Sequence, residues 1–314
     1  MKDLYNLIAN LLLSVILSLS FSLLLITSAS AADLSPSETT ATKLFKMGVE
    51  RMQKQEYLQA VDALTQAIES NPEYTAAHYS RCLAYLELQD NQNAIQDCDR
   101  AIKSSSKKSE NYLSEAYLNR GLAYYRQGNY QAAISDNYQV IKLKPHDFRA
   151  YYNLGITVAA TGNYQQAIHA FNIALTQVPQ FSHLSLANIY NDRGFANLKL
   201  YNLPAAFLDF SQAIRFNPEN DVALLNRGCT CTKIGCLSNA IADFSKLIEL
   251  QPHNPQAYLN RGIARYSLGY EYSAIQDLQA AAGCFALRGE DIAYQQVLDL
   301  IIHYQNKIQL ISFL

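Results

Sequence analysis

Five arginines recur at one position of a repeating pattern, and together they could form a phosphate-binding stripe, because a guanidinium group can bind two phosphate oxygens at once. An aspartate follows each of them sixteen residues later. The five pairs are Arg81 and Asp97, Arg120 and Asp136, Arg193 and Asp209, Arg227 and Asp243, and Arg261 and Asp277. Two repeats carry Met47 or Leu154 in place of the arginine, and these two also lack the aspartate, which is replaced by Ala63 and Ala170.

The joint presence or absence of the two charges favours an ion pair over a ligand site. A buried guanidinium without a carboxylate is costly, so both charges are kept or both are lost. We therefore predict that each pair bridges the two helices of its repeat, with its charged groups within about 4 Å of each other. If the pairs were far apart, the arginines would again be candidates for a binding stripe.

The other reactive residue types form no catalytic pattern. The chain has no Gly-rich phosphate loop, no H-E-x-x-H and no G-x-S-x-G, and its six histidines have no metal-ligand spacing. Cys229, Cys231 and Cys236 read C-x-C-x4-C, which could hold a metal, and Cys82 and Cys98 fall on facing predicted helices and could bridge. We interpret the cysteines as small apolar core residues instead. The prediction is a protein that is not an enzyme and has no cofactor and no metal.

The overall charge argues against a nucleic-acid partner. The 314 residues include 25 lysines and arginines and 27 aspartates and glutamates, which gives a net charge of −2. Nucleic-acid binding requires a concentrated basic face.

Small residues set the spacing of the whole pattern. In order they are Gly48, Cys82, Gly121, Gly155, Gly194, Gly228 and Gly262, with spacings of 34 or 39 residues. An alanine follows each of the seven by twelve residues, and a proline follows five of them by twenty-four. Two helices cross closely only where neither carries a bulky side chain at the contact. The period therefore predicts stacked pairs of helices.

The seven repeats are 41–74, 75–108, 114–147, 148–181, 187–220, 221–254 and 255–288, with five-residue insertions at 109–113 and 182–186. The stretch from Tyr117 to Pro145 reads Y-x-N-R-G-x-A-Y-Y, then G-N-Y-x-x-A-I, then P. It resembles the tetratricopeptide repeat (TPR) family, and the resemblance covers about 41–288. It implies an all-α, right-handed superhelical solenoid of about seven helix-turn-helix repeats.

The repeat 114–147 departs from its neighbours in one aromatic column. Asn137 stands where Phe171, Phe210 and Phe244 stand in their repeats. We expect the adjacent Tyr138 to turn inward and fill that place, which would make this repeat slightly irregular.

The first helices of TPR repeats line a concave groove, and the resemblance implies that this groove is the binding surface. Asn119, Asn153, Asn226 and Asn260 share one column of these helices. An amide has both a donor and an acceptor, so a row of amides can bind the backbone of an extended peptide. The row is similar to the asparagine ladder of some TPR grooves. The alternative is that each asparagine bonds to a neighbouring helix and only shapes the superhelix.

Apolar and aromatic residues flank the asparagines and predict a protein or peptide ligand with apolar anchors. The predicted aromatic contacts are Tyr79, Tyr125, Tyr152, Phe195 and Tyr266. The alternative is that adjacent repeats bury these rings. The resemblance also allows a carboxylate clamp, which needs a lysine and then an asparagine four residues later. No repeat carries that pair, so we reject a clamp-type co-chaperone.

The N-terminus predicts export. Lys2, the apolar run from Leu11 to Ile26 and the sequence Ala29-Ser30-Ala31 fit a signal peptide over 1–31, followed by a flexible linker over 32–40. We expect the repeats to reach the periplasm or a lumen. The alternative is an uncleaved anchor, in which case this segment alone contacts the membrane and the repeats face the same side.

The C-terminal segment 289–314 predicts one more helix, which caps the last repeat. Val297, Ile301, Tyr304, Ile308 and Ile311 form an apolar stripe. Further apolar residues lie off this stripe and suggest a second contact, with a partner or with another copy. They are Leu298, Ile302, Leu310, Phe313 and Leu314.

Together these features predict a scaffold that binds a peptide or protein segment in its groove and supports assembly of an extracytoplasmic complex. The alternative is a structural protein that self-associates through the C-terminal helix.

Overall fold

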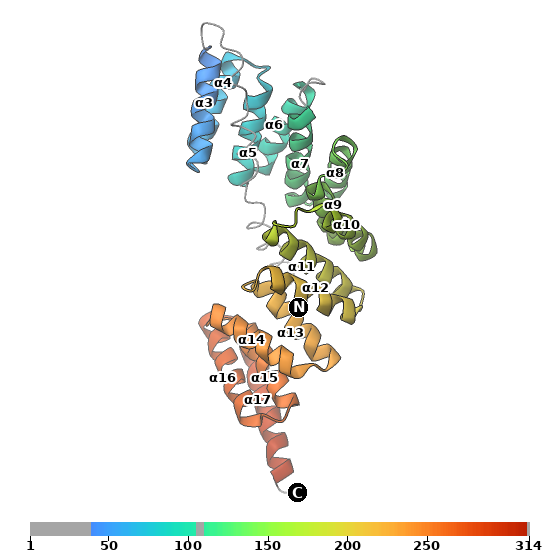
Figure 1. Ribbon diagram of the computed structural model, residues 1–314. Helices are drawn as coiled ribbons and strands as arrows, with labels where there is room; N and C mark the ends of the chain where they lie inside the picture. Colours follow the sequence, from blue (N-terminus) through green and yellow to red (C-terminus); the bar gives the residue numbers. More distant parts are fainter. Residues whose placement is uncertain (1–38, 105–109, 313–314) are drawn as a thin grey trace. The chain divides into compact units, whose positions relative to one another are not determined.

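The computed structural model describes residues 39–104 and 110–312, and this part of the chain is all-α (Figure 1). The predicted signal segment 1–31, and the predicted linker as far as residue 38, lie outside the described residues. The chain divides after Thr161 into two compact parts, which we call the N-terminal and C-terminal parts. Each is described by itself below.

Helices α3 to α9 make up the N-terminal part and α10 to α17 the C-terminal part. The first set is α3 (Thr40–Gln53), α4 (Tyr57–Ser70), α5 (Thr75–Glu87), α6 (Asn91–Ser104), α7 (Glu110–Arg126), α8 (Tyr130–Leu143) and α9 (Phe148–Ala160). The second set is α10 (Tyr164–Gln177), α11 (His183–Lys199), α12 (Leu203–Phe216), α13 (Asp221–Ile234), α14 (Leu237–Leu250), α15 (Pro255–Ser267), α16 (Glu271–Leu287) and α17 (Asp291–Ser312).

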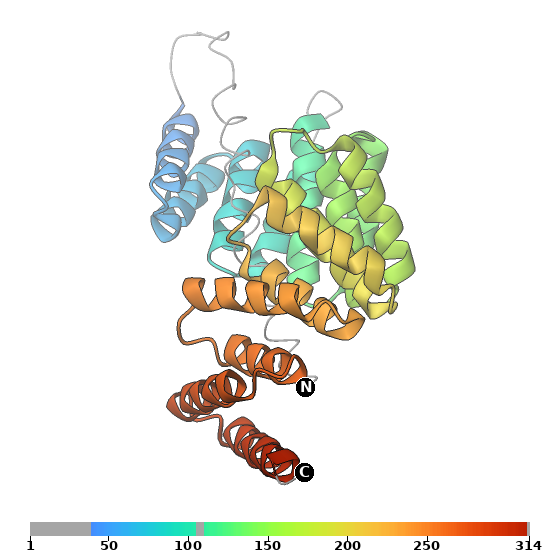
Figure 2. The ribbon, with the colours of Figure 1, turned by 60° about the horizontal axis from the view of Figure 1, so that its bottom comes forward.

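Within each part, every helix packs against the next one along the chain (Figure 2). The first helices of successive repeats also contact each other. These contacts join α3 to α5, α5 to α7 and α7 to α9 in the N-terminal part, and α11 to α13 and α13 to α15 in the C-terminal part. This sequential packing of helix pairs confirms the predicted all-α repeat architecture. The handedness of the superhelix stays a prediction.

The small-residue columns lie where the two helices of a repeat cross. A Cβ atom added to Gly228 would lie 2.6 Å from Phe244 Cε1, and one added to Gly48 would lie 2.6 Å from Leu64 Cγ. The alanine column of the second helices is fully buried, as at Ala60. Gly48 and Gly228 therefore make room for a large side chain of the facing helix, which confirms the reason we gave for the period.

Residues 110–113 and 183–186, which belong to the two five-residue insertions, lengthen helices instead of forming loops. Helices α7 and α11 have 17 residues each, whereas α5, α9 and α15 have 13. The extra residues add about one turn to the N-terminal end of each longer helix. The insertions therefore leave the crossing of the two helices in register.

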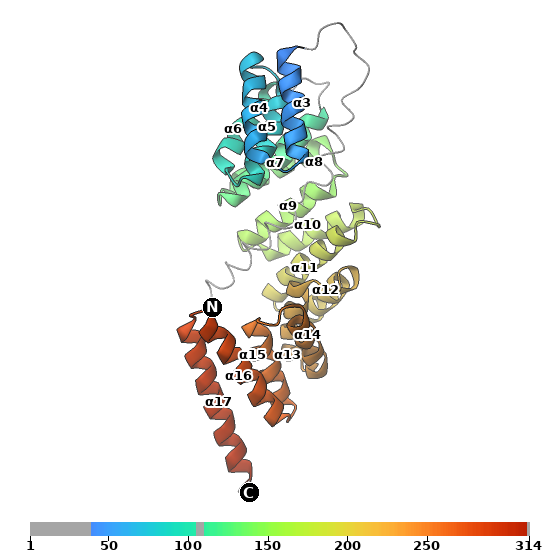
Figure 3. The same ribbon diagram turned by 90° about the vertical axis from the view of Figure 1, so that its left-hand side faces the viewer.

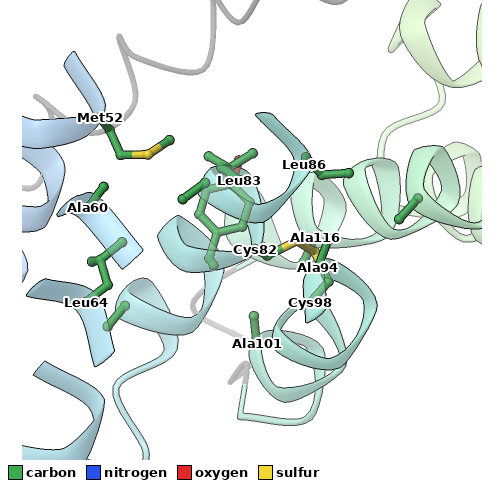
Figure 4. Close-up of a cluster of buried hydrophobic side chains, with 14 of the residues drawn as sticks. Met52, Ala60, Leu64, Cys82, Leu83, Leu86, Ala94, Cys98, Ala101 and Ala116 are labelled. Carbon is green, nitrogen blue, oxygen red and sulfur yellow. A yellow bond between two sulfur atoms is a disulfide. The ribbon is translucent and has the colours of Figure 1, made fainter. Parts of the chain in front are cut away.

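Two predictions about side chains of the N-terminal part were wrong. Tyr138 does not turn inward: it is 47% exposed, and Asn137 itself is buried. Cys82 and Cys98 are not free thiols but form a disulfide between α5 and α6, with their Cα atoms 5.5 Å apart. Figure 4 shows this bond within the cluster of buried side chains around Leu83 and Leu86. Geometry at the helix crossing brings the two sulfur atoms together.

The predicted capping helix is present as α17, which packs against α16 at the end of the chain (Figure 3). Val297 and Ile301 are buried, and the ring of Tyr304 stacks on that of Tyr266 with centroids 3.5 Å apart. Ile302 is 54% exposed. The side chains of 309–314 lie outside the described residues. Within 39–104 and 110–312, no helix is both long enough and apolar enough to span a bilayer.

Candidate peptide-binding surface

All five predicted arginine–aspartate pairs form between the two helices of their repeats. The shortest nitrogen–oxygen distance in each pair lies between 2.5 and 2.7 Å, so the predicted limit of about 4 Å is confirmed. The aspartate side chains are 4–6% exposed and the arginine side chains 15–23% exposed. In Arg227 the hydrogen bond to Asp243 raises the pKa of the guanidinium above its ordinary value.

Each of these arginines makes a third contact, with the second helix of the preceding repeat. The Nη1 acceptors are Thr65 for Arg81, Asp99 for Arg120, Asn172 for Arg193, Ser211 for Arg227 and Ser245 for Arg261. We did not predict this column. Its members lie 16 residues before the arginine, or 21 where a five-residue insertion intervenes. The arginines thus tie three helices together and are not a phosphate-binding stripe.

Cys229 and Cys231 of α13 lie near Cys236, which precedes α14, and all three are free thiols. Burial raises the pKa of the Cys229 thiol to about 11, and burial with a hydrogen bond to Cys236 raises that of Cys231 further. Thiolates are the form that attacks electrophiles and binds metals. Among the described residues, no three His, Cys, Asp or Glu side chains are grouped so as to hold a metal ion.

The asparagine column divides into two kinds of residue. Asn119 Nδ2 donates to Tyr79 Oη at 3.4 Å, and Asn260 Nδ2 donates to Cys229 Sγ at 3.7 Å. These two bond to a neighbouring first helix, as the alternative interpretation required. The side chains of Asn153, which is 9% exposed, and of half-buried Asn226 make no hydrogen bond within the described part of the chain.

The five predicted aromatic contacts also divide. Tyr79 is 4% exposed and Tyr152 is 8% exposed, so both belong to the packing of the N-terminal part and not to an open surface. Burial also raises the pKa of Tyr79. Tyr125, Phe195 and Tyr266 are half-buried. One face of the Tyr266 ring is covered by the stacked ring of Tyr304. Our prediction for Tyr79 and Tyr152 therefore needs correction, because adjacent helices bury them.

A pocket opens between two first helices of the N-terminal part. Its lining residues are Gly121, Leu122 and Tyr125 of α7, Asn137 of α8, and Asn153, Ile156 and Thr157 of α9. Asn137 is 1% exposed, and its Oδ1 atom has no hydrogen-bond partner. The sequence marked Asn137 only as an irregularity. The signal for a pocket was an amide in a column of large apolar rings.

Comparison with known families agrees with this geometry. The Tetratricopeptide repeat family profile matches residues 45–109 and 118–180. The matched residues of this chain are tetratricopeptide repeats. Human serine/threonine-protein phosphatase 5 is 36% identical over 92 residues, which are 29% of this chain and 17% of the phosphatase. The chain spans between 17% and 25% of the length of the curated relatives it matches.

Solved structures share the fold of this protein at low identity. A tetratricopeptide repeat protein from Parabacteroides merdae is 16% identical to this chain, with a TM-score of 0.58. The match covers 84% of this chain and 99% of that one. YrrB, described as a TPR protein with an unusual peptide-binding site, is 18% identical with a TM-score of 0.54, over 66% of this chain and all of its own.

Proposed function

We propose that this protein is a non-enzymatic scaffold that holds an extended peptide segment of a partner protein along the first helices of one of its two parts. The observation that carries the proposal is the unsatisfied polar chemistry of this face. Asn226, in α13 of the C-terminal part, is half-buried, and Asn153, in α9 of the N-terminal part, is 9% exposed but lines a pocket. Neither side-chain amide makes a hydrogen bond within the described part of the chain. Each amide can pair with one peptide unit of an extended backbone.

Apolar side chains beside these asparagines supply the anchors. Leu122 and Ile156 line the pocket next to Asn153, and Leu225 lies beside Asn226 in sequence; all three are half-buried. The arginines do not contribute, since their aspartate pairs occupy them. The ligand that fits is therefore a neutral or mixed segment with apolar anchors, not a phosphorylated or strongly acidic one.

Replacing both free asparagines tests this proposal. In the full-length chain, Asn153→Ala with Asn226→Ala should weaken binding of a peptide selected from a displayed random dodecamer library by about two- to tenfold, because the part that holds the peptide loses a hydrogen bond worth about 0.5–1.5 kcal/mol. Fluorescence anisotropy of the labelled peptide measures the change. The matched control is Gln139→Ala with Gln276→Ala, which alters two exposed amides of second helices. Equal affinity in both double variants would rule out the asparagine ladder.

We also propose that the protein is exported and supports assembly of a complex outside the cytoplasm, as the signal-like segment 1–31 suggests. The disulfide between Cys82 and Cys98 supports this proposal, because disulfides persist mainly in oxidising compartments. We expect a protease added outside the cytoplasm to cleave a tag placed after residue 314. We also expect the mass of the mature protein to lack residues 1–31.

Exposed apolar residues near the C-terminus favour a second candidate function, self-association. Leu287 is 83% exposed, Ile292 79% and Ile302 54%. Light scattering of the full-length chain should then show a dimer or larger species, and Ile292→Lys with Ile302→Lys should shift it to the monomer. A monomer in both proteins excludes self-association through this helix.

A further inference from the structure

Two free cysteines lie at the ends of the turn that joins α13 to α14. Cys231 is near the end of α13, and Cys236 is the N-cap residue of α14. The backbone N–H of Cys236 donates to the Cys231 carbonyl oxygen at 3.0 Å, and Gly235 between them has a φ of 85°. A glycine with positive φ commonly ends a helix, and this bond closes the turn that follows. The turn therefore holds the two cysteines close together.

Five other repeats close the corresponding turn with the same backbone hydrogen bond. The N–H and carbonyl residues are Glu56 and Arg51, Asp90 and Tyr85, Asn129 and Tyr124, Asn202 and Asn197, and Tyr270 and Arg265. In the first of these turns the side chains meet as well, because Arg51 Nη1 donates to Glu56 Oε2. Side chains at these two positions of a repeat can therefore touch each other across the turn.

The thiols of Cys231 and Cys236 are in such contact. Cys236 packs against the buried cluster that contains Cys231 and Phe244. Burial, and next a hydrogen bond between the two thiols, raise the pKa of Cys231. A disulfide requires the sulfur atoms to approach to about 2.05 Å, and rotation of the two side chains can bring thiols in contact to that distance.

Neither cysteine makes the polar contact that its position makes in other repeats. Asn197 and Arg265 correspond to Cys231, and each donates to the aspartate of its own repeat, at 2.9 and 2.8 Å. Asn129 corresponds to Cys236, and its side chain accepts from a backbone N–H of the next helix, whereas Cys236 makes no capping bond. Thiols are weak hydrogen-bonding groups. Two thiols at the two ends of one turn are better explained by a reaction between their sulfur atoms.

We propose that Cys231 and Cys236 are a redox site that forms a second intrachain disulfide by exchange with a small-molecule disulfide. Cys236 is half-buried and Cys231 fully buried, so the thiolate of Cys236 attacks the reagent first. One thiolate of the reagent leaves, and Cys236 carries a mixed disulfide. The Cys231 thiol then loses its proton and attacks the Cys236 sulfur, which releases the second thiolate. Two cysteine thiols are oxidised, and one reagent disulfide is reduced to two thiols that take up the two protons.

The other two free cysteines take no part in this reaction. Cys229 lies two residues before Cys231, so it points away from it on α13, and Asn260 Nδ2 donates to its sulfur there. Cys284 lies in another helix, α16. The redox site does not depend on peptide binding, and it adds a covalent link to the repeat 221–254 under conditions that keep Cys82 and Cys98 oxidised.

Mass spectrometry of the full-length chain tests the redox site, because trypsin cuts after Lys233 and separates the two cysteines. The protein is equilibrated with oxidised glutathione, the remaining thiols are alkylated in urea, and the digest is made without reductant. We expect the peptide 228–233, which contains Cys231, to be linked to the peptide 234–246, which contains Cys236. The linked pair should weigh two hydrogen atoms less than the separate peptides. An excess of reduced glutathione should return both peptides to their alkylated forms.

Single variants identify the linked thiols and their order of reaction. Cys229→Ala should leave the linkage unchanged, because the peptide 228–233 then has Cys231 as its one cysteine. Cys231→Ala should end the linkage and leave glutathione attached to Cys236. Cys236→Ala should end it and leave Cys231 without glutathione, because that thiol is buried.

The Cys82–Cys98 disulfide is the internal control, since both cysteines lie in the tryptic peptide 82–100. If Cys231 and Cys236 stay alkylated at every glutathione ratio while that disulfide is present, the redox site is wrong and the two are apolar core residues. Linkage that persists in Cys231→Ala would assign the bond to Cys229 and overturn the proposal. Linkage found solely in a covalent dimer on a non-reducing gel would overturn it as well.

Discussion

Replacing Asp243 with alanine should lower the free energy of unfolding by about 3–5 kcal/mol, because it leaves the Arg227 guanidinium without its carboxylate. Asp243 is 4% exposed and accepts hydrogen bonds from both Nε and Nη2 of Arg227, at 2.9 and 2.6 Å. The arginine side chain is 23% exposed, so water cannot replace the lost partner fully. Urea unfolding followed by circular dichroism measures the change. As a control, Asp62→Ala, at an exposed position of α4, should change stability by no more than about 0.5 kcal/mol.

Another repeat of the same chain suggests a second variant for this experiment. The repeat that begins at 148 has Leu154 and Ala170 where other repeats have the charged pair, and both residues are buried. Arg227→Leu with Asp243→Ala should therefore recover most of the loss, since a buried ion pair and an apolar pair of similar volume are often equally stable. Ser211 keeps its own hydrogen bond to the Phe207 carbonyl oxygen. A double variant as unstable as Asp243→Ala alone would show that the unpaired Arg227 guanidinium is not the cause of the loss.

One offset explains much of what the sequence could predict. Residues sixteen apart face each other where the two helices of a repeat cross. Arg227 and Asp243 have this separation, as do Gly228 and Phe244. We found the ion pairs because their charges appear and disappear together in seven repeats. The same register predicts the glycine column, because a large residue of the facing helix needs the space.

The parts that we missed have physical reasons. The third arginine contact uses threonine, aspartate, asparagine and serine, which share only an oxygen acceptor, and the insertions shift its spacing. Tyr79 and Tyr152 are buried because successive first helices contact each other, and the pattern of one helix does not report this contact. Asn137 stays inside because its amide bonds the Ala133 carbonyl, which holds it in the phenylalanine column.

The sequence predicted which residues share the candidate surface but not which of their side chains are already hydrogen-bonded. A column of the sequence identifies which face of a helix a residue occupies, and Asn119, Asn153, Asn226 and Asn260 do share such a column. The column does not say which neighbouring atoms reach the side chain. Asn119 meets a phenol and Asn260 a sulfur atom, whereas Asn153 lies at a pocket. The choice between ladder and helix contact therefore depends on residues in the neighbouring repeat.

Reducing the disulfide between Cys82 and Cys98 should lower the free energy of unfolding by about 3 kcal/mol, which is the effect expected when a loop of about fifteen residues is no longer closed in the unfolded chain. The two cysteines are 16 apart and occupy the glycine and phenylalanine columns of their repeat. The covalent bond thus stands where a ring packs on glycine in other repeats. Urea unfolding with and without a reductant measures the difference, and thiol alkylation followed by mass spectrometry confirms the redox state.

Two double variants separate the covalent effect from packing. Cys82→Gly with Cys98→Phe copies the pair formed by Gly228 and Phe244, so it should restore the packed crossing and respond to no reductant. Cys82→Ala with Cys98→Ala lacks both the bond and the ring, and should be the least stable of the three proteins. Because Leu83, Leu86 and Ala94 belong to the same buried cluster, loss of packing there should reach both helices of the repeat. An oxidised wild type that unfolds at the same urea concentration as the fully reduced protein would show that the disulfide adds no stability.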